Sequence, residues 1–174
     1  GDFLGNFLLA SVKAAENNQD ESFELINKIS KPYNNLKRIQ SSFLQCYFDL
    51  PKTEESFTRL TNDTEFNFLR YNFFLSNYLL HKNKNTEARK VVNVSRKKNN
   101  SNILLKQTEN FILSGETEKI KKFFNCKNLE DSLAEIFYII ANLYSTEEDY
   151  KLSNFYLKIS FFLNNKFIPH KSLL

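Results

Sequence analysis

The sequence feature that most constrains the fold is a turn that recurs at a nearly constant interval. Its five occurrences begin at Asn17, Pro51, Asn83, Gly115 and Glu148. Successive turns are therefore 32 to 34 residues apart along the whole chain. An interval of this size is typical of proteins in which one two-helix unit is repeated and each unit packs on its neighbours.

Units that begin fourteen residues before each turn share a pattern of side chains. They start at Phe3, Lys37, Leu69, Ser101 and Ala134. Positions seven and eleven are mostly large and apolar, and residues four apart share one face of a helix. Position twenty is small in four of the five units, as a close helix crossing requires. Position twenty-four is apolar in all five: Ile26, Leu60, Val92, Phe124 and Leu157.

Each unit is thus predicted to be two helices of about a dozen residues joined by a short turn. Composition supports an all-α fold, because three Gly and three Pro in 174 residues are too few for the many turns of a β-sandwich. Hydrophobic residues make up 41% of the chain and aromatic residues 15%, which predicts a buried core. We expect one helical-repeat domain over residues 1–174, with its units stacked in chain order.

The last unit has the clearest pattern. Its helices are predicted over residues 131–146 and 149–163, with Asp149 as the N-cap of the second. Asp63 and Lys127 place polar groups late in the second helices of the second and fourth units. Those two helices are therefore expected to be shorter.

The last unit also resembles the tetratricopeptide repeat. The residues that carry the resemblance are Phe137, Ile140, Ala141, Tyr144, Ser153, Leu157 and Ser160, with Asn165 where that family has Pro. The first and third units match at fewer positions, and the second and fourth are degenerate. The resemblance implies an α-α superhelix of about five repeats that binds a protein or peptide, or serves as a scaffold. The start of the chain, Gly1 to Leu4, is similar to bacterial repeat proteins.

Residues 168–174 have the pattern of the beginning of a sixth unit, which would make the chain part of a longer repeat protein. The alternative is a short capping helix that ends the repeat array.

The resemblance also predicts where a ligand binds, because the first helix of each tetratricopeptide unit lines a concave face. Position nine on that face is polar in every unit, and polar groups are costly to bury, so these side chains are expected to face water or a ligand. The alternative is that they form the solvated side of each helix. The predicted binding residues are Arg38, Gln45, Arg70, Phe73, Asn77, Glu109, Tyr138 and Asn142.

Two other functions remain open from the sequence. A structural spacer or assembly hub would use convex faces or chain ends and would have no groove ligand. A helical-repeat RNA binder is disfavoured, since the net charge is only +4 and Glu109 and Glu135 place negative charge on the predicted concave face.

Catalysis is not expected. His81 and His170 are the only histidines, and no nucleophile, phosphate-binding or metal-binding motif is present. His81 is expected to face solvent at a helix C-terminus. No cofactor, metal or membrane span is predicted, and the sequence does not distinguish a cytoplasmic from a periplasmic location. Cys46 and Cys126 allow one disulfide bond, whose presence the sequence leaves open.

Overall fold

The computed structural model describes residues 3–63 and 69–167, and within them it contains ten helices and no strand. The all-α prediction is confirmed. The helices follow one another along the chain as five pairs. Their bounds are α1 Phe3–Ala15, α2 Gln19–Asn27, α3 Asn34–Tyr47, α4 Thr53–Thr61, α5 Leu69–His81, α6 Asn85–Lys98, α7 Ile103–Leu113, α8 Thr117–Phe123, α9 Leu129–Thr146 and α10 Tyr150–Leu163. However, α3 and α4, the pair of the second predicted repeat, belong to different compact units.

Each pair of helices is joined by a turn of the same geometry. The second residue after the first helix of each pair has a left-handed backbone: Asn17, Asp49, Asn83, Gly115 and Glu148, with φ between 56° and 75°. At the first turn, the Asn18 amide donates to the Lys13 carbonyl and the Asn17 amide to the Ala14 carbonyl. These two hydrogen bonds define the Schellman motif, and the equivalent pair is present in all five turns. The second turn uses Asp49 rather than the predicted Pro51, whose ring forbids positive φ.

The helices are distributed between two compact units. Unit 1 contains Gly1–Leu50 and Cys126–Leu174, so it holds α1, α2, α3, α9 and α10. Unit 2 is the intervening segment Pro51–Asn125, with α4 to α8.

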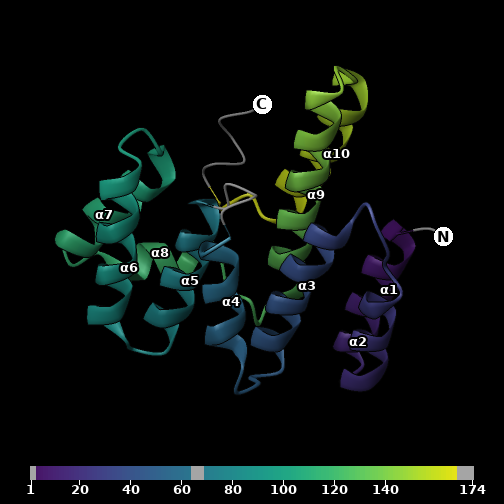
Figure 1. Cartoon of the computed structure of the whole chain (residues 1–174), viewed down its shortest axis with the longest axis horizontal. Coiled ribbons are helices and arrows are strands. Elements are labelled where there is room, and N and C mark those ends of the chain that lie inside the picture. Colours follow the sequence, from purple (N-terminus) through teal and green to yellow (C-terminus); the bar gives the residue numbers. More distant parts are fainter. Residues whose placement is uncertain (1–2, 64–68, 168–174) are drawn as a thin grey trace. The chain divides into compact units, whose positions relative to one another are not determined.

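In unit 1, α9 packs against α10, its partner in the fifth pair, and also against α3 and α1 (Figure 1). The helices α3 and α1 belong to the second and first predicted repeats. The stacking order within unit 1 therefore differs from the chain order that the sequence predicted. Leu9, at position seven of the first repeat, is 51% exposed instead of lying in the core.

In unit 2, α5 packs against α4, α6, α7 and α8. The second helices of the second and fourth repeats, α4 and α8, are only nine and seven residues long, whereas α6 and α10 each have fourteen. The predicted shortening is confirmed for α8, whereas α4 is no shorter than α2, the second helix of the first repeat, which also has nine residues. Position twenty-four is buried in every pair, which also confirms the repeat pattern.

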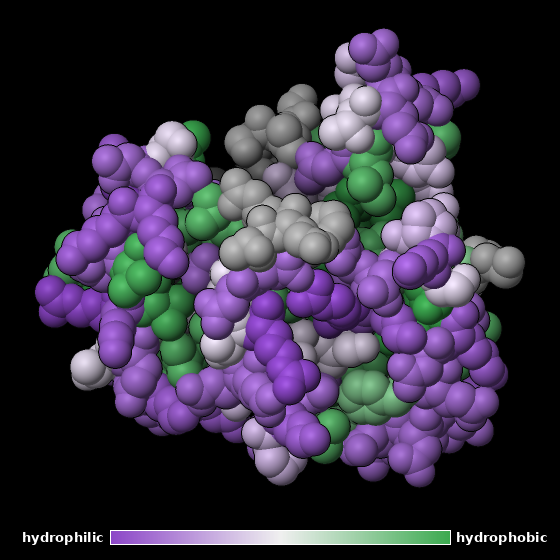
Figure 2. Space-filling model, in the orientation of Figure 1, coloured by the Kyte–Doolittle hydropathy of each residue, from purple (hydrophilic) through white to green (hydrophobic). Residues whose placement is uncertain are grey.

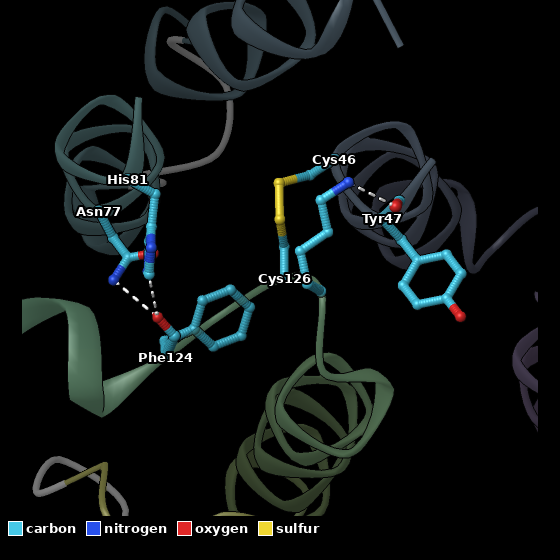
Figure 3. The surroundings of a disulfide bond; sticks show 7 residues. Cys46, Tyr47, Asn77, His81, Phe124 and Cys126 are labelled. Carbon is cyan, nitrogen blue, oxygen red and sulfur yellow. Dashed lines mark hydrogen bonds between the residues drawn. A yellow bond between two sulfur atoms is a disulfide. The ribbon is translucent and has the colours of Figure 1, made fainter. Parts of the chain in front are cut away.

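Unit 1 is closed by a disulfide bond between Cys46, in α3, and Cys126, just before α9 (Figure 3). The two Cα atoms are 5.9 Å apart. Next to this bond, the Lys127 ammonium donates a hydrogen bond of 2.8 Å to the Tyr47 carbonyl. The bond and the hydrogen bond fasten the two chain segments that build unit 1, and the 80-residue interval between the cysteines contains all of unit 2.

The expected sixth unit or cap at residues 168–174 lies outside the described residues. In the part of the chain that is described, no helix has both the length and the apolar character needed to cross a bilayer.

Candidate binding groove

The face of α5 that was predicted to be concave is buried inside unit 2. Phe73 is fully buried and Asn77 is only 2% exposed. The Asn77 amide nitrogen donates to the carbonyl of Ile120 at 3.0 Å and to that of Phe124 at 2.8 Å. Figure 3 shows the second of these bonds. These carbonyls lie at the end of α8, where a helix leaves its last carbonyls without backbone partners. The prediction that Asn77 faces water or a ligand is therefore wrong, because its amide serves as a buried cap for α8.

His81 takes part in the same contact. Its Nε2 lies 3.2 Å from the Phe124 carbonyl, so the tautomer that satisfies this carbonyl carries its proton on Nε2. The Phe124 ring packs edge-on against Phe74 of α5, with the ring centres 4.8 Å apart. The expected solvent-facing position of His81 is corrected, because the ring is half-buried and bound to the chain that follows α8.

The other six predicted binding residues do not form one continuous exposed surface. Arg38, Gln45, Tyr138 and Asn142 belong to unit 1, and Arg70 and Glu109 to unit 2; all six are half-buried. Glu109 pairs with Arg96 at 3.2 Å, and the Asn142 amide donates to the Tyr138 carbonyl one helical turn earlier. Glu109 and Asn142 are therefore occupied by contacts within their own unit.

Glu135 adds a further correction. It was expected to place negative charge on the concave face, but it is fully buried in α9.

A different surface of unit 2 forms a groove with a volume of about 320 Å³. It lies between α4 and α6, with α5 beneath, and none of the eight predicted residues lines it. Apolar side chains from α5 and α6 supply much of the lining: Leu69, Leu75, Leu79, Val91 and Val94. Figure 2 shows an apolar strip bordered by polar side chains over α5 and α6.

The hydroxyl groups that line this groove already donate hydrogen bonds to carbonyls of their own helices. Thr58 donates to the Glu54 carbonyl at 2.8 Å, Thr61 to the Thr58 carbonyl at 2.8 Å, and Ser95 to the Val91 carbonyl at 2.8 Å. A hydroxyl that bonds its own helix offers a ligand mainly its carbon atoms. The groove therefore offers a ligand mainly carbon atoms, together with the amide groups of Asn62 and Asn72.

Charged residues lie around this apolar surface. Glu54 and Glu87 are in the first turns of α4 and α6, where the helix dipole favours negative charge. Lys84 donates to Glu54 at 2.6 Å, which brings the N-terminal ends of α4 and α6 together. This hydrogen bond and the carboxylate charge raise the pKa of Lys84. Lys90 and Lys98 lie further along α6.

One residue of the sequence is a signal for this groove that lies outside the repeated apolar positions. Val94 is at position twenty-six of its unit, on the outer face of the second helix, where a polar residue would be usual. It is 45% exposed and is flanked by charged side chains. One exposed apolar residue indicates a binding surface only when neighbouring helices contribute further apolar side chains beside it. The placement of α4 beside α5 could not be derived from the repeat alone.

Comparisons of the chain with protein-family models, curated proteins and solved structures found no match.

Proposed function

We propose that the chain is a helical-repeat module, built from degenerate tetratricopeptide-like hairpins, that binds or scaffolds a protein or peptide segment without covalent chemistry. The groove between α4, α5 and α6 is the binding surface in this proposal. It replaces the concave face suggested by the resemblance, because Phe73 and Asn77 are buried.

The observation that carries the proposal is an open groove of about 320 Å³ that combines an apolar lining with charged borders. That volume is within the usual range for binding sites in proteins. Apolar surface of this kind is favourable to cover, at roughly 25 cal/mol for each Å² removed from water. Charged borders supply orientation and specificity.

The test is a selection of displayed peptides against the protein, followed by fluorescence-polarisation titrations with the synthetic peptides obtained. Val94→Glu places a charge in the groove and is expected to weaken binding at least tenfold, because the buried charge must be desolvated. Val12→Glu is the matched control: Val12 is 50% exposed on α1 in unit 1, and Val94 is 45% exposed. It is expected to leave the affinity unchanged.

Selected peptides that bind both variants as tightly as the unmodified protein would refute the groove as the binding surface. A selection that yields no peptide with affinity for the folded protein would refute the proposal as a whole.

A further inference from the structure

The outward face of α10 differs from the same face of every other second helix. Four apolar side chains share one side of α10, at intervals of three, four and three residues: Leu152, Phe155, Ile159 and Phe162. Phe155 is 56% exposed and Phe162 is 84% exposed. In the other four pairs, the positions that correspond to Leu152 and Phe155 are polar. They are Glu21 and Glu24 in α2, Glu55 and Thr58 in α4, Glu87 and Lys90 in α6, and Lys119 and Lys122 in α8. The apolar stripe is therefore a property of α10 and not of the repeat.

The charges of α10 are also unlike those of the other second helices. Each of α2, α4, α6 and α8 has an acidic residue in its first turn, where the helix dipole favours negative charge. The first turn of α10 has no acid and contains Lys151 instead. Lys158 and Lys166 follow, and residues 150–167 contain no Asp or Glu. All three lysines are exposed, and none makes an ion pair among the described residues. This positive charge would be favoured by a negative surface outside the protein.

The acidic groups around α10 lie toward its N-terminal end and on the helix beside it. Three are in the turn before α10: Glu147, Glu148 and Asp149. The Asp149 carboxylate serves as the N-cap and accepts a backbone amide of α10 at 3.1 Å. Among the acids of α9, which packs against α10, only Glu130 is exposed, and Lys127 lies three residues before it. The segment from Phe155 to Lys166 therefore combines exposed rings and lysines without an acid of its own.

We propose that this segment of α10 binds the surface of an anionic lipid bilayer. The helix lies parallel to the membrane surface, with the rings of Phe155 and Phe162 inserted among the lipid head groups. Lys158 and Lys166 lie at the lipid phosphates. Apolar and aromatic side chains beside lysines are typical of helices that bind in the bilayer interface. This inference concerns unit 1, goes beyond the proposed function and does not depend on the groove in unit 2.

A bilayer fits this face better than a protein does. The two exposed rings protrude from a single helix, and a protein partner would need a shaped pocket for each of them. Lipid chains are fluid and accept the rings in any arrangement. A second copy of this chain would present the same lysines and no acid from its own α10, so the positive charge would stay uncompensated.

The test is sedimentation of the whole protein with vesicles. One set contains equal parts of phosphatidylserine and phosphatidylcholine, and the other contains phosphatidylcholine alone. The unmodified protein is expected to bind the anionic vesicles about tenfold more tightly than the neutral ones, because each lysine near an anionic surface adds about fivefold to the affinity. This difference is expected to disappear in 1 M salt. Circular dichroism checks that every variant is folded.

The contribution of the rings is tested with Phe155→Ser/Phe162→Ser. This variant is expected to bind the anionic vesicles at least about tenfold more weakly, since two apolar side chains no longer leave water. The matched control is Leu9→Ser/Val12→Ser, at positions that are 51% and 50% exposed on α1. The control is expected to retain the affinity of the unmodified protein.

The contribution of the lysines is tested with Lys158→Glu/Lys166→Glu. This variant is expected to lose at least about tenfold in affinity for the anionic vesicles. The control Lys90→Glu/Lys98→Glu changes the net charge by the same amount at exposed positions of α6. It is expected to lose less than about twofold, because α6 does not face the bilayer.

Several results would overturn the inference. The first is an absence of binding to anionic vesicles, and the second is an equal loss in the two lysine variants, since binding would then follow net charge alone. Unchanged binding of Phe155→Ser/Phe162→Ser would show that the rings do not enter the lipid. If the protein ignores vesicles but forms a dimer that this variant abolishes, as measured by light scattering, the face belongs to a contact between copies. If it ignores vesicles but binds an acidic amphipathic peptide, the face belongs to a protein partner.

Discussion

Removal of the disulfide bond is expected to cost the protein about 4 kcal/mol of unfolding free energy. The bond joins Cys46 and Cys126, which are 80 residues apart. In the chain-entropy treatment, closing a loop of that length reduces the freedom of the unfolded chain by about 4.5 kcal/mol at 25 °C. Both cysteines are buried, at 3% and 8% exposure, so alanine is the suitable replacement because it introduces no polar group into the site.

The assay compares urea unfolding of the protein with that of Cys46→Ala/Cys126→Ala, followed by circular dichroism. The double variant is expected to unfold at lower urea and with a larger dependence on denaturant, because its unfolded chain is more expanded. Adding a reductant to the unmodified protein should reproduce the stability of the variant. Equal stability within about 1 kcal/mol, without reductant, would refute the reasoning from loop length.

Three further predictions concern single side chains. Asn77→Ala removes the donor to two carbonyls at the end of α8 and is expected to lower the free energy of unfolding, measured in urea, by about 2 kcal/mol. The control Asn142→Ala loses one hydrogen bond within its own helix and should lower it by less than about 0.5 kcal/mol. Gln40→Met is expected to raise the unfolding free energy by about 1 kcal/mol, because the Gln40 amide is fully buried and has no hydrogen-bond partner among the described residues; a loss of stability would contradict this. Glu54→Gln is expected to lower the pKa of Lys84 toward its ordinary value of 10.5, which NMR of the lysine side chain can follow. An unchanged pKa would show that the ion pair between Lys84 and Glu54 is not formed in solution.

The hairpins could be predicted from the sequence because the signals for them are local. Asn or Gly, which tolerate positive φ, follows the first helix in three of the five pairs, and the apolar positions recur within a dozen residues on either side. The N-cap at Asp149 is equally local, since its carboxylate accepts from the amide of Leu152 at 3.1 Å. Such features depend on a few neighbouring residues and need no knowledge of the tertiary structure.

The packing of the hairpins could not be predicted in the same way. Asn77 has the same position in its unit as Asn142, yet its partners are 43 and 47 residues away while the partner of Asn142 is one turn away. The difference arises from the packing of α8 on α5. The residues found at equivalent positions of the five units do not reveal that packing. The groove was missed for the same reason, because it requires α4, α5 and α6 to be placed together first.

The most direct test of the central claim is an NMR titration of the methyl groups with a peptide obtained from the selection against the folded protein. The account predicts chemical-shift changes at Leu75, Leu79, Val91 and Val94, which line the groove in unit 2. It also predicts unchanged methyl signals from the exposed residues of α1 in unit 1, Leu9 and Val12. Shift changes confined to unit 1, with the groove methyl signals unchanged by bound peptide, would contradict the claim.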